Sequence, residues 1–111
     1  MNREEKRAEF FLRVAITVQR CGKEGIKLMP FSFKRTLQEQ KHFVEHGKSE
    51  KLDSKHLDWL AIDLVVVKDG VLVWSYCFEY EVMREYAQQI GLKVLPLGGK
   101  LNDIYHLEYP E

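Results

Sequence analysis

The stretch Ala61-Ile62-Asp63-Leu64-Val65-Val66-Val67, followed by Lys68-Asp69-Gly70 and Val71-Leu72-Val73-Trp74, decides the fold of this 111-residue chain. Both apolar runs are rich in β-branched residues, and Asp-Gly between two such runs is the strongest short signal for a β-hairpin. Asp63 is the one charge inside the first run. Burying a bare carboxylate is prohibitively costly, so we expect Asp63 to be paired, to bind a metal or to face solvent.

The segments before the hairpin predict two helices and an edge strand. Residues 3–19 repeat apolar side chains at three- and four-residue steps, which indicates an amphipathic helix that Gly22 can end. The short apolar segment 26–33 is broken by Pro30 and is typical of an edge strand or an extended segment. Thr36-Leu37-Gln38-Glu39 is a capping-box sequence, which predicts a helix from there to Gly47. The polar residues 48–57 predict a loop.

The segments after the hairpin complete the expected fold. Residues 79–90 predict a helix stopped by Gly91, and residues 93–95 and 104–109 predict closing strands around a turn at 96–99. Helices with an antiparallel sheet give an α+β domain, here a small antiparallel sheet flanked by about three helices. A chain of 111 residues is long enough for one domain, residues 1–111, with one modest core.

Composition and charge limit the classes of partner and cellular location that we expect. Seventeen basic residues balance seventeen acidic ones, so charge gives no reason to expect nucleic acid or an anionic membrane as a partner. The first six residues carry both signs of charge and lead into no apolar stretch, which predicts synthesis in the cytoplasm without a signal peptide and without membrane insertion. Cys21 and Cys77 form no C-x-x-C pair. They are expected to be reduced and buried, with a disulfide or a nucleophilic role as the alternative.

Two histidines and a carboxylate form a candidate metal site. His56, Asp63 and His106 can supply the three protein ligands of a catalytic zinc and leave the fourth position to water. Asp103 stands three residues before His106, a plausible place for a general base. If the strands that carry Asp63 and His106 pair, alternation along each strand lets these two side chains converge. The alternative is a loop histidine, an exposed strand carboxylate and an ordinary strand histidine.

A second motif competes for the metal. His42-Phe43-Val44-Glu45-His46 fits H-x-x-E-H, a zinc-protease helix signature in which Glu45 would be the base. His46 would lie in the last turn of the helix that ends at Gly47, where the helix dipole alone favours a histidine. A solvated helix face is therefore the alternative for this motif.

Four separated segments resemble one enzyme family. Residues 54–63 resemble the S-x-H-x-x-G-x-A-x-D signature of the zinc D-alanyl-D-alanine carboxypeptidase family, which includes phage L-alanyl-D-glutamate endolysins. Residues 103–106 resemble its second signature, an acidic residue followed three places on by histidine, and Gly98-Gly99 resembles the glycine pair before it. Residues 33–36 with Gln40 resemble the family's aromatic-x-Arg-Ser/Thr segment. The resemblance covers residues 31–108 in the expected order.

This resemblance implies a fold, a cofactor and residue roles. The fold would be hedgehog/D-Ala-D-Ala-peptidase-like, and Zn²⁺ would be bound by His56, Asp63 and His106. Asp103 would deprotonate the attacking water and protonate the leaving amine. Arg35 would steady the substrate carbonyl or oxyanion, and Ser54 with Arg35 would contact the substrate.

The implied function is zinc-dependent hydrolysis of peptidoglycan stem peptides, by an L-Ala-D-Glu endopeptidase or a D-Ala-D-Ala-type carboxypeptidase. A monomeric phage or prophage endolysin, acting on the bacterial cell wall after release, is the expected setting. The alternative is a non-catalytic wall-peptide-binding or phage structural module on the same fold. Three departures bear on substrate preference. Trp59 occupies the family's glycine position, and Leu97 replaces the tryptophan that usually precedes the glycine pair. Only three residues separate Gly99 from Asp103, so the loop that would line the cleft is shorter than in many relatives.

Overall fold

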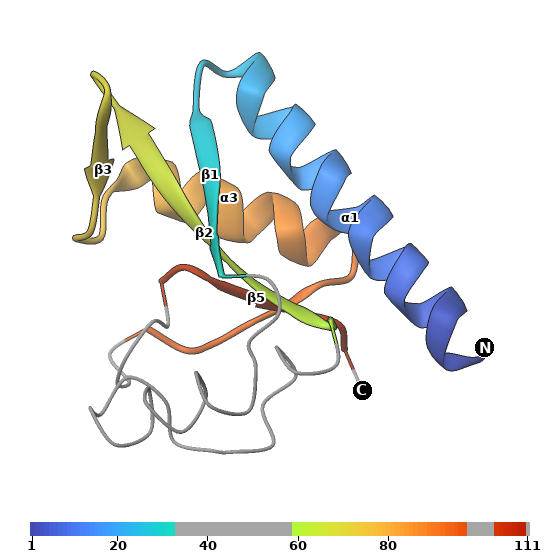
Figure 1. Cartoon of the computed structure of the whole chain (residues 1–111). Helices are drawn as coiled ribbons and strands as arrows, with labels where there is room; N and C mark the ends of the chain where they lie inside the picture. Colours follow the sequence, from blue (N-terminus) through green and yellow to red (C-terminus); the bar gives the residue numbers. More distant parts are fainter. Residues whose placement is uncertain (33–58, 98–103, 111) are drawn as a thin grey trace.

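The protein is an α+β domain in a computed structural model that describes residues 1–32, 59–97 and 104–110 (Figure 1). The predicted helix from Thr36 to Gly47 lies outside these residues. The described elements are α1 (Arg3–Lys23), β1 (Lys27–Ser32), β2 (Ala61–Lys68), β3 (Val71–Val73), α3 (Phe78–Gln89), β4 (Lys93–Val94) and β5 (His106–Glu108). The expected α+β class is confirmed, with two helices and one antiparallel sheet in the part described.

The sheet is built around β2. The strand order is β1-β2-β5-β4, and β3 also pairs with β2. Because β1 and β5 both pair with Asp63, they lie along opposite edges of β2, and β3 continues the edge that β5 begins. β1 carries Pro30, which cannot donate to a strand ladder, so its place on the outside of the sheet agrees with the predicted edge strand.

The hairpin forms at the predicted position. Asp69 and Gly70 both have positive φ, 54° and 77°, the backbone that a two-residue turn between twisted strands requires. Tyr80 of α3 bridges the two hairpin strands. Its hydroxyl accepts a hydrogen bond from the Val66 N–H at 2.9 Å and donates one to the Val73 carbonyl. A fully buried tyrosine thus satisfies two backbone groups where β3 ends.

Both helices end at a glycine, but the first ends later than predicted. Gly22 lies inside α1, and Gly25 has the positive φ of 79°. The Gly25 N–H donates to the Gly22 carbonyl and the Ile26 N–H donates to the Cys21 carbonyl, the bond pattern of a Schellman motif. The prediction of an end at Gly22 was therefore wrong, because the left-handed residue that reverses the chain is three positions on. Gly91, with φ of 85°, ends α3 as predicted.

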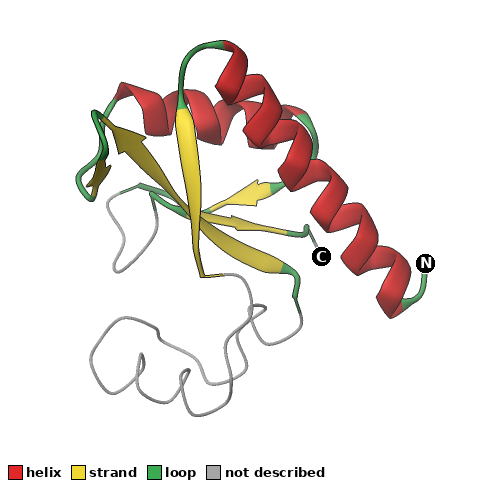
Figure 2. Ribbon diagram, turned by 45° about the horizontal axis from the view of Figure 1, so that its top comes forward, coloured by secondary structure: helices red, strands yellow, loops and turns green. Residues whose placement is uncertain are grey.

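The core lies between the helices and the sheet. Figure 2 shows α1 and α3 on the same side of the strands. Residues from both helices join β2 and β5 in one buried apolar cluster, which includes Phe10, Val14, Tyr80, Met83, Leu64, Val66 and Leu107. Burial of these side chains is the main force that holds the helices on the sheet.

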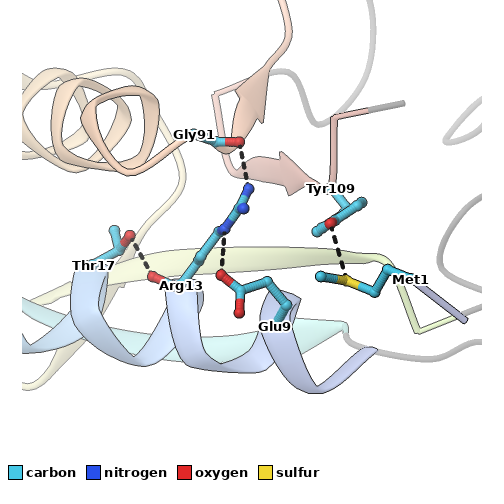
Figure 3. A network of polar contacts seen from close by, with 6 residues as sticks. All are labelled: Met1, Glu9, Arg13, Thr17, Gly91 and Tyr109. Atoms are coloured by element: carbon cyan, nitrogen blue, oxygen red, sulfur yellow. Dashed lines mark hydrogen bonds and ion pairs between the residues drawn. The ribbon is translucent and has the colours of Figure 1, made fainter. Parts of the chain in front are cut away.

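A polar network fixes α1 against the far end of α3 and the end of the described chain (Figure 3). The Arg13 guanidinium contacts Glu9 at 3.1 Å, donates to the Gly91 carbonyl at 3.1 Å and lies 5.2 Å from the centre of the Tyr109 ring. A Cβ on Gly91 would lie 3.1 Å from the Arg13 Nη1 atom. Glycine is favoured here by the positive φ, and a larger residue would also press on the Arg13 guanidinium.

Two further predictions concern the cysteines and the membrane. Cys21 is buried, Cys77 is partly buried, and neither is in a disulfide. Burial, aided by the nearby Glu24 carboxylate, raises the pKa of the Cys21 thiol to about 11, so this cysteine is an unreactive thiol at neutral pH. Within residues 1–32, 59–97 and 104–110, no helix is long and apolar enough to cross a bilayer.

Candidate metal centre

Asp63 and His106 are brought together by the pairing of β2 with β5. They are direct register partners in this antiparallel pair. The Asp63 Oδ1 atom lies 3.4 Å from the His106 Nδ1 atom, and the side chains are 1% and 13% exposed. The sequence predicts that Asp63 is paired, binds a metal or faces solvent, and its burial excludes exposure to solvent. The residue that faces it, His106, is itself a predicted zinc ligand.

The pair lies on the face of the sheet that is turned away from the helices. Ile62 and Leu64 line a groove together with Val14 of α1, so they face the helix. Side chains alternate along a strand, and Asp63 between them therefore points to the opposite face, as does its partner His106. The candidate centre is thus separated from the main core by the thickness of β2.

Glu108 contacts the other side of the His106 ring. It follows His106 by two residues on β5, and its Oε1 atom lies 2.9 Å from the His106 Nε2 atom. Burial lowers the pKa of His106, but the hydrogen bonds to Asp63 and Glu108, with their charges, outweigh burial and raise the pKa to about 9. In the metal-free protein His106 is therefore an imidazolium at neutral pH, held between two carboxylates.

The other predicted site residues lie outside the described part of the chain. These are His56, Asp103, Arg35 and Ser54, and also His42, Glu45 and His46 of the competing motif. In the ranges that are described, no group of three or more His, Cys, Asp or Glu side chains is arranged to hold a metal. Asp63 and His106 are two of the three expected ligands, and a buried carboxylate oxygen facing an imidazole nitrogen suits zinc chemically.

An aromatic row supports the turn that leads into His106. Phe31, Trp74 and Tyr105 make successive edge-to-face contacts, with ring centres 5.2 and 5.8 Å apart. The Tyr105 hydroxyl donates to the Trp74 carbonyl, and the Tyr105 carbonyl accepts from the Leu64 N–H at 3.0 Å. Burial and the negative charge of Asp63 raise the pKa of Tyr105. This row joins three segments that are distant in the chain, so the order of residues alone does not reveal it.

Trp59, at the position where the resemblance expects a glycine, has a left-handed backbone. Its φ is 62°, in the left-handed region that side chains with a Cβ rarely occupy. Trp59 therefore holds a backbone conformation that costs free energy for a residue with a Cβ. Its ring lines the apolar groove beside Phe11 and Ile62, a groove of about 820 Å³ between α1 and the sheet. Asp63 and His106 are not among the residues that line this groove.

Comparison with known proteins identifies the fold. No family model matches the sequence, and no curated protein matches it. Among solved structures, the L-Ala D-Glu endopeptidase ChiX of Serratia marcescens is similar over 77% of this chain and 68% of its own, with 21% identity and a TM-score of 0.65.

Two further solved structures agree. The D,D-pentapeptidase VanY of a VanB-type resistance cassette, solved with Zn(II), is similar over 90% of this chain and 70% of its own, with 16% identity and a TM-score of 0.68. The L,D-carboxypeptidase DacB from Streptococcus pneumonia is similar over 93% of this chain and 65% of its own, with 20% identity and a TM-score of 0.64. The expected D-Ala-D-Ala-peptidase-like fold is confirmed.

Proposed function

We propose that this chain, in which the peptidase fold sets Asp63 opposite His106, is a zinc-dependent peptidase of peptidoglycan stem peptides. The observation that carries the proposal is the 3.4 Å approach of the Asp63 carboxylate to the His106 imidazole inside the sheet. A buried carboxylate beside an imidazole is weak evidence for a structural role, because desolvation offsets their attraction, whereas they are two of the donors that a catalytic zinc needs. Similarity of fold to peptidases of wall peptides supports the same substrate class.

The proposed chemistry divides among the chain's own residues. His56, Asp63 and His106 hold Zn²⁺, which when bound supplies a Lewis acid that activates water and polarises a carbonyl. Asp103 takes a proton from the attacking water while the water oxygen bonds to the carbonyl carbon. The same carboxyl then gives the proton to the amine as the carbon–nitrogen bond breaks. Arg35 stabilises the charge that develops on the carbonyl oxygen, and Ser54 contacts the peptide.

The proposed setting is a phage or prophage endolysin that acts as a monomer on the bacterial wall after its release from the cytoplasm. The structural neighbours include an L-Ala D-Glu endopeptidase, a D,D-pentapeptidase and an L,D-carboxypeptidase. The proposal therefore specifies hydrolysis of a stem-peptide bond, with the L-Ala-D-Glu bond and the terminal D-Ala-D-Ala bond as the two candidates.

Mass spectrometry of purified peptidoglycan after digestion tests this function and identifies the bond. The zinc-loaded protein is expected to release fragments with new peptide termini, and a chelator is expected to abolish their release. His106→Ala is the matched inactive control. If zinc-loaded protein binds stem peptides but cleaves none from any wall type, the chain is a binding module and the enzymatic proposal is wrong.

A further inference from the structure

We propose that Glu108 is a positioning residue that fixes the His106 ring so that Nδ1, and not Nε2, is the nitrogen available to the metal. This inference rests on the proposed function, because it concerns the same zinc. The structure provides its basis: the Glu108 Oε1 atom lies 2.9 Å from Nε2, and the Asp63 Oδ1 atom lies 3.4 Å from Nδ1. The two sides of one ring are therefore assigned to two different carboxylates.

The chemistry of imidazole separates the roles of these carboxylates. A neutral histidine has one N–H and one lone pair, and an ionised carboxylate can only accept a hydrogen bond. If Nε2 carries the proton, it donates to Glu108 and the lone pair on Nδ1 faces Asp63. The opposite tautomer would direct the Nε2 lone pair at the Glu108 carboxylate at 2.9 Å, a closer repulsive contact than the 3.4 Å between Nδ1 and Asp63. A cation bound by Nδ1 and Asp63 would relieve the second contact but not the first. Glu108 therefore selects the tautomer whose free nitrogen lies beside the other expected zinc ligand.

The strand that carries Glu108 makes this contact rigid. Glu108 is the register partner of Ala61 on β2 and of Lys93 on β4, so its backbone is held on both sides. Its side chain is 12% exposed and that of His106 is 13% exposed, which leaves little water to compete for the hydrogen bond. Carboxylates that accept from the second nitrogen of a ligating histidine orient the ring and raise its basicity.

Zinc affinity tests the role of Glu108 independently of catalysis. Competition against a chromophoric chelator is expected to show binding about 10- to 100-fold weaker for Glu108→Ala than for the wild type. Glu108→Gln should lose less, because its amide oxygen can still accept from Nε2–H. The control is Glu79→Ala, which removes a glutamate that contacts Lys68 at 3.2 Å on the hairpin side of the fold. Glu79→Ala should bind zinc as the wild type does.

Nitrogen NMR of histidine-labelled, zinc-loaded protein provides the second readout. The His106 signals, assigned by their loss in His106→Gln, should show a proton on Nε2 and none on Nδ1 in the wild type. In Glu108→Ala, the Nε2 proton should exchange faster with water. A wild-type ring bound through Nε2, or Glu108→Ala with unchanged zinc affinity, would overturn the inference.

The outcomes separate this inference from the proposed function. A wild-type protein that binds no zinc refutes both. A wild type that binds zinc and cleaves wall peptides, with Glu108→Ala matching it in zinc affinity, refutes the role of Glu108 alone. If Glu108→Ala does not fold, the wild-type tautomer and the affinity of Glu108→Gln still decide the question.

Discussion

Asp63 of β2 and His106 of β5 face each other across a strand pair, with Oδ1 and Nδ1 3.4 Å apart and almost no exposure to solvent. Removing two such groups from water costs several kcal/mol per ion, a cost that their mutual attraction must first offset, so a buried pair of this kind is weak evidence for a role in stability. Replacement of a buried ion pair by apolar residues of similar volume is often neutral or stabilising. The arrangement is therefore better explained by a function than by stability.

The first prediction is stoichiometric zinc. Protein purified without added metal should contain about one zinc per chain by elemental analysis, because a carboxylate and two histidines complete a three-ligand site. A His56→Ala, His106→Ala double variant should contain none. Unchanged zinc in that variant would exclude these histidines as ligands.

The competing helix motif gives the control for zinc binding. His42→Ala and His46→Ala should each keep the metal, since neither belongs to the proposed ligand set. Loss of zinc from either variant would instead favour the H-x-x-E-H arrangement with Glu45 as the base.

The second prediction concerns stability. The proposed zinc site is formed only in the folded chain, so a chelator should lower the melting temperature in calorimetry. Asp63→Asn should reproduce part of the loss, because it weakens metal binding while it keeps the size of the side chain. Superimposable traces with and without chelator would mean that the metal is absent or peripheral.

The third prediction is the pH dependence of the metal-free protein. The pKa of His106 is raised from 6.5 to about 9, so the folded state holds a proton that the unfolded state loses first. The resulting stabilisation, on the order of 3 kcal/mol, is fully present below pH 6.5 and is lost as pH rises through 9. Denaturant titrations at pH 6 and 9.5 should show this fall, and His106→Gln should remove it.

Zinc reverses the sign of this dependence. Binding must displace a proton from His106, so zinc affinity should rise with pH up to about 9. Calorimetry at pH 7.5 in buffers of different ionisation enthalpy should detect the released proton. A zinc affinity that is independent of pH between 7 and 9 would contradict the assignment of His106 as a ligand.

The sequence predicted the features that depend on local chemistry. The hairpin followed from Asp69-Gly70, and the importance of Asp63 followed from its being the one charge in an apolar strand. The face shared by His106 and Glu108 could be predicted from strand alternation, but their contact could not, because it depends on rotamers. The Phe31–Trp74 contact depends on long-range packing, which periodicity does not reveal.

The fourth prediction concerns the backbone at Trp59. Trp59→Gly and Trp59→Ala both remove the ring, so the difference between them reports the backbone alone. At a φ of 62°, glycine should be more stable than alanine by about 0.5–1 kcal/mol in denaturant unfolding. Gly22 lies inside α1 with open space around it, so Gly22→Ala is the control. At this helical position the difference in stability should have the opposite sign, with alanine more stable than glycine by about 1 kcal/mol. Equal stability of the two Trp59 variants would mean that this backbone carries no strain.

The last prediction separates catalysis from binding and concerns Asp103, which lies outside the described residues. If Asp103 is the general base, Asp103→Asn should keep zinc and fold while it loses wall-peptide hydrolysis by roughly two to four orders of magnitude. The two side chains are nearly equal in size, so packing should barely change. Asp103→Glu should keep some activity, because the family resemblance indicates that either acid can serve. The assay is release of new amino termini from purified peptidoglycan, with zinc analysis of the same preparation. Full activity in Asp103→Asn would remove this residue from the mechanism, and loss of zinc would make it a ligand instead.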